Sequence, residues 1–135
     1  MKKSRFVVKA EKSPDCVGEW RNIDYPLFSF RYFDDTTIKK VKEGRFFIEF
    51  LNRLAKLSEL GWNGIATSAR HSYGLEQMPT ATLRRTGNLP PIFSGVEKLD
   101  VFRATGDNRV FAGVRDGKVF HILMIEYAFG DVSPH

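Results

Sequence analysis

Cysteine and histidine are scarce in this chain of 135 residues, which contains one Cys and three His. The single cysteine, Cys16, cannot form an internal disulfide, so the chain does not belong to the small secreted folds that disulfides hold together. The four side chains are dispersed and have none of the ligand spacings found in zinc sites. The sequence therefore predicts neither a metal site nor a cofactor.

Long apolar runs are also missing. No segment approaches the roughly 18 consecutive apolar residues that a membrane span requires. The longest apolar stretch, residues 119–127, is interrupted by His121 and Glu126. The basic residues 1–5 are not followed by an apolar segment of the length found in signal peptides. We therefore expect a cytoplasmic protein with no membrane partner.

The composition is that of a folded and mildly basic protein. The hydrophobic fraction is 42% and the aromatic fraction 13%, which is too apolar for a disordered chain. The length suits one domain spanning residues 1–135. The net charge of +5 leaves two readings open. It favours an anionic partner, nucleic acid first, but it also fits an ordinary solvated surface.

Residues 1–40 have the pattern of an N-terminal extension or arm. A short strand is predicted at residues 5–10, and alternating aromatic residues predict another at residues 27–33. Residues 44–60 form the clearest helix, because their Phe and Leu side chains recur at helical spacing along one stripe. Gly61 is a plausible end for this helix. A second, shorter helix at residues 62–73 would then complete an antiparallel helical hairpin.

The C-terminal third predicts three strands, at residues 98–104, 109–115 and 118–127. Asp116-Gly117 is a strong signal for a two-residue hairpin turn. If these two residues form the loop, Val114 lies opposite Val119 and Ala112 opposite His121. Both faces of this hairpin carry apolar residues, so it is covered on both sides or lies centrally. We expect an α+β fold, with a helical hairpin packed on a small antiparallel sheet that ends in a three-stranded meander.

The segment from Leu99 to Phe111 contains Arg103, Gly106 and Arg109 in an Arg-x-x-Gly-x-x-Arg pattern. Together with the order of elements, it makes residues 44–135 resemble the RelE/ParE toxin superfamily. The resemblance implies a toxin-like, RNA-binding protein of a toxin-antitoxin system. Such a protein would act on RNA or the ribosome, bind an antitoxin protein, and possess metal-independent endoribonuclease activity.

The same resemblance implies roles for individual residues. Arg103 takes the place of the Arg that stabilises charge at the scissile phosphate, and Arg109 is the second Arg of the pattern. RNA-cleaving members also carry Arg and Tyr, or His, in the C-terminal tail. Here Phe129 and Ser133 stand near the expected Arg and Tyr. His135 is then the acid/base candidate in the tail.

Two further polar clusters are candidates. The segment from Arg70 to Glu76 offers His71, Tyr73 and Glu76 as acid/base groups and Arg70 as a phosphate contact. The interpretation that we favour is the C-terminal end of a helix, where Arg and His are electrostatically favoured. The second cluster is the pair Arg84 and Arg85, which can contact a phosphate backbone or simply face solvent. The candidate catalytic residues are thus Arg103, His71 and His135, and the candidate nucleic-acid ligands are Arg109, Arg70, Arg84 and Arg85.

Three functional hypotheses follow. The first is a metal-independent endoribonuclease. The second is a binding module without chemistry, whose partner is a protein or a nucleic acid. The third is an unrelated α+β protein, such as one from a mobile element, whose meander resembles the family by convergence. A mobile-element protein with a degenerate toxin fold is a further alternative. His121, in the middle of a strand, reads as a core residue in each case, and nothing in the sequence indicates an oligomeric state.

Overall fold

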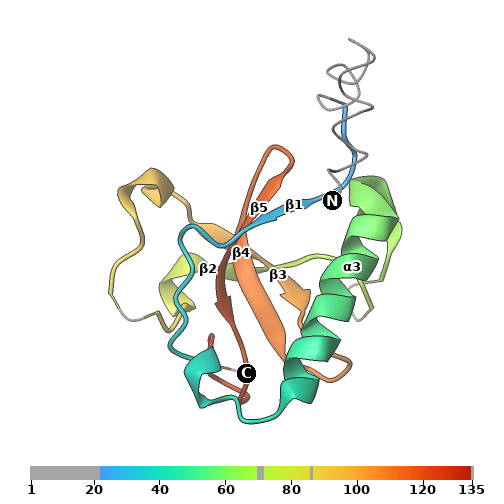
Figure 1. The fold of residues 1–135 in the computed structure, drawn as a ribbon. Helices are drawn as coiled ribbons and strands as arrows, with labels where there is room; N and C mark the ends of the chain where they lie inside the picture. The colour runs from blue at the N-terminus through green and yellow to red at the C-terminus, as the bar shows by residue number, and fades with distance from the viewer. Residues whose placement is uncertain (1–21, 70–71, 86, 135) are drawn as a thin grey trace, which may run out of the picture.

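The computed structural model describes residues 22–69, 72–85 and 87–134, and Figure 1 shows how their elements are arranged. The arm at residues 1–21, with the strand expected at residues 5–10, lies outside the described residues. In chain order the elements are β1 Leu27–Ser29, the short 3-10 helix η1 Ile38–Lys40, α3 Gly44–Thr67, β2 Glu76–Pro79, the 3-10 helices η2 Thr80–Thr82 and η3 Pro91–Phe93, β3 Lys98–Arg103, β4 Val110–Asp116 and β5 Val119–Ile125.

The fold is α+β, as expected, and the described residues form a sheet of five strands in the order β1-β5-β4-β3-β2. The antiparallel meander β3-β4-β5 is confirmed, with bounds close to those predicted. The sheet is not antiparallel throughout, because β1 pairs in parallel with β5. The predicted strand at residues 27–33 is shorter than expected and ends at Ser29. The sequence did not predict β2, which adds antiparallel to β3 at the other edge.

The register of the β4–β5 hairpin differs from the prediction. Asp116 pairs with Val119, so the two loop residues are Gly117 and Lys118. Gly117 has a φ of +63°, and a two-residue turn with Gly in its first central position is of the II′ kind. The whole register is therefore displaced, and Val114 lies opposite His121. The prediction took the right turn signal but placed the loop one residue too early.

A β-bulge between Ala112 and Gly113 shifts the register again further along the hairpin. It adds a residue to β5, so Met124 and Ile125 lie on the faces opposite to those that strict alternation along the strand would give. Met124 packs in the cluster away from α3, while Ile125 packs in the cluster beneath α3. Strict alternation along a strand fails at a bulge because two residues there oppose one on the partner strand.

The expected helical hairpin is wrong, because residues 44–67 form a single helical element with a kink. Gly61 has a φ of +73°, which ends the first helical segment as predicted. The chain does not reverse there. The next amide, Trp62 N, donates to the carbonyl of Asp24 at 2.7 Å, and the helix resumes to Thr67. Within the described part of the chain, no helix is both long and apolar enough to cross a bilayer.

Hydrophobic side chains fill both faces of the sheet, which confirms that the β4–β5 hairpin is covered on both sides. Helix α3 covers one face (Figure 1), and the stripe residues Phe46, Phe50 and Leu57 are buried there. The other face is covered by the segments between β2 and β3 and by the C-terminal tail. The buried residues of this second cluster are Met78, Phe93, Leu99, Val101, Ala112, Leu123, Met124 and Val132.

Candidate functional site

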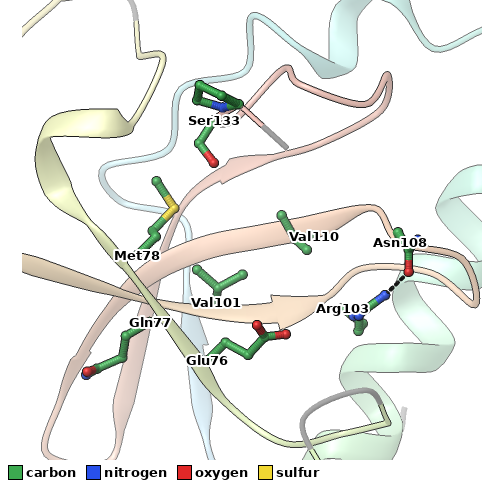
Figure 2. A pocket seen from close by; sticks show the side chains of 9 residues that line it. Glu76, Gln77, Met78, Val101, Arg103, Asn108, Val110 and Ser133 are labelled. Atoms are coloured by element: carbon green, nitrogen blue, oxygen red, sulfur yellow. Dashed lines mark hydrogen bonds between the residues drawn. The ribbon is translucent and has the colours of Figure 1, made fainter.

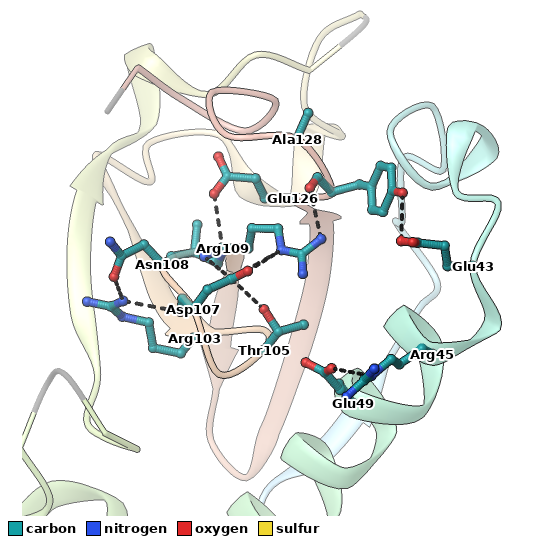
Figure 3. A network of polar contacts seen from close by, with 12 residues as sticks. Glu43, Arg45, Glu49, Arg103, Thr105, Asp107, Asn108, Arg109, Glu126 and Ala128 are labelled. Carbon is teal, nitrogen blue, oxygen red and sulfur yellow. Dashed lines mark hydrogen bonds and ion pairs between the residues drawn. The ribbon is translucent and has the colours of Figure 1, made fainter.

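The turn between β3 and β4 is organised by the carboxylate of Asp107. It accepts hydrogen bonds from Thr105 Oγ1 at 2.7 Å and from Arg109 N at 2.9 Å, and it forms an ion pair with Arg109 Nε at 3.0 Å. Partial burial acts to raise the pKa of Asp107, but the hydrogen bonds from Thr105 and Arg109 outweigh it, so the pKa lies below its ordinary value. Asp107 therefore stays ionised and fixes the two ends of the turn (Figure 3).

Arg109 supports the structure of this turn. Its guanidinium donates to the carbonyl of Tyr127 at 3.2 Å and lies 5.0 Å from the centre of the Phe46 ring. The side chain is only 20% exposed. These contacts link the start of β4 to α3 and to the tail. Since they already occupy the guanidinium, the proposed role of Arg109 as a nucleic-acid ligand gains no support from its surroundings.

Arg103 lies on the other face of the sheet. It lines a pocket together with Val101 and Val110, whereas Arg109 packs on the α3 side. Figure 3 shows the two guanidinium groups on opposite sides of Asp107. The two arginines therefore do not present a joint pair of cationic forks, although they flank the same turn.

The pocket at Arg103 has a volume of about 410 Å³ and opens to solvent between β2, β3, β4 and the tail (Figure 2). Arg103 Nη1 donates to the side-chain oxygen of Asn108 and, at 3.4 Å, to the carbonyl of Asp107. These contacts orient the guanidinium at one end of the pocket. The lining residues are Glu76, Gln77, Met78, Val101, Arg103, Asn108, Val110, Ser133 and Pro134.

Glu76 brings a carboxylate to the same pocket. It is the first residue of β2 and pairs with Val101, two residues before Arg103 on β3. Side chains two residues apart share a face of a strand, so Glu76 and Arg103 project on the same side of the sheet. Figure 2 shows the carboxylate of Glu76 extending toward the side where Arg103 lies. The pocket thus combines a cation and a potential proton acceptor.

The C-terminal tail folds back to form one wall of this pocket. Glu126 is fully buried, and its carboxylate accepts hydrogen bonds from the amides of Val110 and Gly130. Arg84 holds the tail from the other side, since its amide donates to the carbonyl of Val132 at 2.7 Å. These bonds bring Ser133 and the following proline to the pocket. No local pattern in the sequence predicts these hydrogen bonds, because they join residues far apart in the chain.

The other candidate residues are dispersed. Arg84 donates to the carbonyl of Gly130 at 3.0 Å, and Arg85 donates to that of Tyr32 at 2.9 Å, so both arginines hold loops together. Arg70, His71 and His135 lie outside the described residues. Sequence analysis did not single out Gln77, Asn108 or Val110 as lining residues, since only the pairing of β2 with β3 brings the first of these to the site.

Tyr73 and His121, two further polar residues considered in the sequence, both contact aromatic or cationic side chains away from the pocket. Tyr73 packs against the cluster beneath α3, with Arg53 lying 4.5 Å from its ring centre, so it does not join Glu76 at the pocket. His121 is half-buried and contacts the rings of Tyr32 and Phe93 edge-on. That agrees with its interpretation as a packing residue, although its Nδ1 atom has no hydrogen-bond partner among the residues that the structure describes.

The chain matches no family model, no curated protein and no solved structure. The resemblance to RelE/ParE toxins therefore stays a prediction from the sequence pattern around Arg103. Within residues 22–69, 72–85 and 87–134, no three His, Cys, Asp or Glu side chains are grouped so that they can hold a metal ion.

Asp131 gives a pH-dependent prediction about the tail. Its carboxylate is 12% exposed and pairs with Lys40 Nζ at 2.7 Å. Burial acts to raise its pKa, but the hydrogen bonds from Lys40 and from the amide of Ala128 outweigh it, so the pKa is lowered. A carboxyl whose pKa is lowered by folding stabilises the protein above its unfolded pKa of about 4, and this contribution is lost as the pH falls through the folded pKa.

We therefore expect Asp131→Asn to lower the free energy of unfolding at neutral pH and to lose this deficit in acid. Urea denaturation at about pH 7 and about pH 3 measures both values. Asp116→Asn, at an exposed position in β4, serves as the control and should match the wild type at both pH values. A deficit that is equally large at both pH values would show that the charge of Asp131 is not what stabilises the tail.

Proposed function

We propose that this protein is a toxin-like RNA-binding protein of the RelE/ParE type, which holds a backbone phosphate at Arg103. The observation that carries the proposal is the position of Arg103 at the rim of an open pocket with polar neighbours. A planar guanidinium binds phosphate by two parallel hydrogen bonds, and it keeps its charge at every physiological pH. Asn108 orients the group from one side.

The pocket also supports a metal-independent cleavage reaction. The 2′-oxygen of a ribose attacks the adjacent phosphorus, a P–O2′ bond forms, and the P–O5′ bond breaks to release a 5′-hydroxyl. In this scheme Glu76 accepts the proton of the 2′-hydroxyl, and Arg103 stabilises the charge that grows on the phosphoryl oxygens. His135, bonded to the pocket residue Pro134, would give a proton to O5′, and His71 is an alternative base.

A binding module without chemistry is the second candidate. Phe129 and Ser133 occupy the tail positions where RNA-cleaving relatives would carry Arg and Tyr, and the described lining residues include no imidazole. Such a module would bind an RNA, an antitoxin or another protein target through the same surface. RNA binding without cleavage would favour this second function.

The distribution of charge along the chain indicates which residues would attract RNA. Residues 1–21 hold six Lys or Arg and three Asp or Glu, so they contribute +3 of the net +5. The described residues carry nearly equal numbers of both signs. If the basic character serves RNA, most of the non-specific attraction to the backbone therefore comes from the N-terminal arm, while Arg103 supplies one oriented contact.

Salt titration of RNA binding tests this division. A fluorescently labelled single-stranded RNA is titrated at about 50–200 mM salt, and the logarithm of affinity is plotted against that of the salt concentration. Each phosphate contact contributes about 0.7 to the slope for a single strand. Replacing Lys2, Lys3 and Arg5 by Gln should reduce the slope by about 2, and Arg103→Ala by about 0.7.

Lys56→Gln is the matched control, because Lys56 lies on α3 and pairs with Glu59 at 3.1 Å. It should leave the slope unchanged. Absence of RNA binding by the wild type even at about 50 mM salt would contradict the RNA-binding proposal, since phosphate contacts are strongest at low ionic strength.

A further inference from the structure

Helix α3 carries a second apolar stripe that faces away from the sheet. Phe47, Ile48 and Leu51 are 38%, 60% and 61% exposed, and Ala55, one turn further on, is also exposed. Their spacing of one, three and four residues places them side by side on one helix face. The core stripe lies on a different face of the same helix. Contiguous apolar surface of this kind on a folded protein marks an interaction site more often than isolated exposed residues do.

Charged residues of alternating sign run along one edge of this stripe. At 3.6 residues per turn, Arg45 and Glu59 border the stripe, and Glu49 and Lys56 lie further round the helix on the same side. Within the chain, Arg45 pairs with Glu49 at 3.5 Å and Lys56 with Glu59 at 3.1 Å. The order along the helix is therefore positive, negative, positive, negative.

When two copies of the helix run antiparallel, this order of charges on one copy lies opposite charges of the other sign on the second copy. In an antiparallel copy of the helix, the sequence of charges becomes negative, positive, negative, positive. Arg45 then meets Glu59 of the other copy. A two-fold axis perpendicular to the helices keeps the charged edges of both helices on the same side, so the pair of Arg45 and Glu59 forms twice. In a parallel two-fold pair the charged edges would lie on opposite sides of the contact, so these ion pairs could not form.

We propose that α3 docks against α3 of a second copy of this chain, antiparallel, about a two-fold axis near Asn52. The apolar stripes form the contact and the charged edges set the direction, with the helices crossing at about 20° as in other closely packed antiparallel pairs. One helix from each copy buries less area than a standard interface, so the dimer should form at micromolar concentration. The Arg103 pocket stays open, because its apolar walls, Met78 and Val101, belong to the cluster on the other face of the sheet.

Sedimentation velocity of the full chain, at concentrations from about 1 to about 200 µM, tests the proposal. We expect a reversible monomer–dimer equilibrium. Leu51→Ser should weaken dimerisation by at least about tenfold, because it removes apolar area at the centre of the contact. Ile92→Ser is the matched control: Ile92 is 63% exposed but lies on η3, so dimerisation should not change.

A charge swap tests the antiparallel direction. Arg45→Glu alone and Glu59→Arg alone should each weaken the dimer by about tenfold, since each creates two like-charge contacts. The double variant Arg45→Glu/Glu59→Arg should recover most of the affinity. Glu at position 45 lies in the first turn of α3, where acidic side chains are tolerated, so folding is not the limiting factor.

Three results would overturn the proposal. The first is a monomeric wild type at about 200 µM in low salt, a concentration far above a micromolar dissociation constant. The second is a dimer that Leu51→Ser leaves intact, which would place the contact elsewhere. The third is a double variant no better than either single one, which would reject the antiparallel pairing. Thermal melts of each variant at low concentration separate lost association from lost folding.

Discussion

Arg103→Ala is expected to reduce the proposed RNA cleavage by about 10²–10³-fold, the cost of removing one group that stabilises transition-state charge. Growth inhibition after induced expression in a bacterial host should disappear with it. The fold should persist, since the side chain is only half-buried and bonds chiefly within its own turn. The measurements are growth and bulk translation after induction, together with in vitro cleavage in the presence of a metal chelator.

Two companion variants show whether the guanidinium itself is responsible. Arg103→Lys keeps the charge but loses the planar fork, so it should also be impaired. Asn108→Ala removes the partner that orients the guanidinium and should have a smaller effect. A folded and fully toxic Arg103→Ala protein would remove Arg103 from the site. A wild type that binds RNA in a salt-dependent way but does not cut it would select the binding module instead.

Gly113→Ala is expected to destabilise the protein by at least about 3 kcal/mol, a large effect for a single methyl group. A Cβ atom at position 113 would lie 2.0 Å from the carbonyl oxygen of His121 and 2.8 Å from the ring of Phe120. Gly113 lies in β4 between Ile122 of β5 and Asp100 of β3, next to the bulge, and Phe120 is fully buried. Neither the backbone of β5 nor this ring can move without disturbing the centre of the sheet.

Urea denaturation of Gly113→Ala against the wild type measures this loss. Gly106→Ala is the matched control, because nothing lies within 4 Å of a Cβ atom there and its backbone is not in the left-handed region. It should stay within about 0.5 kcal/mol of the wild type. If Gly113→Ala proved equally stable, the close approach of β4 to β5 at the bulge would have to be wrong.

Local patterns predicted the secondary structure best where a strong period met a strong turn signal. The meander was predicted closely, because the Thr105–Asn108 turn and the glycine turn at Gly117 bound three β-rich segments. The predicted register of the β4–β5 hairpin was wrong by one loop residue, and this error has a physical cause. Asp116-Gly117 can supply either both loop residues or only one of them, and only pairing with Val119 decides between these.

The candidate site was predicted in part. Arg103 was chosen from its place in a pattern, and it does line a pocket. Glu76 was noted only as one member of a cluster with His71 and Tyr73, and Tyr73 packs elsewhere. The wall formed by the tail was not foreseen, because the bonds of Glu126 and Arg84 that hold it connect residues distant in sequence.

The amino-acid sequence by itself determined the α+β class, the three strands of the meander, the apolar stripe of the long helix and the end of its first segment at Gly61. Each depends on near neighbours in the chain, where periodicity and backbone preference act directly. Only the tertiary structure decided the rest: the parallel strand β1, the edge strand β2, the bulge at Gly113, and which arginine faces the pocket. Those features are set by pairing and packing between distant segments, whose free energies no local pattern contains.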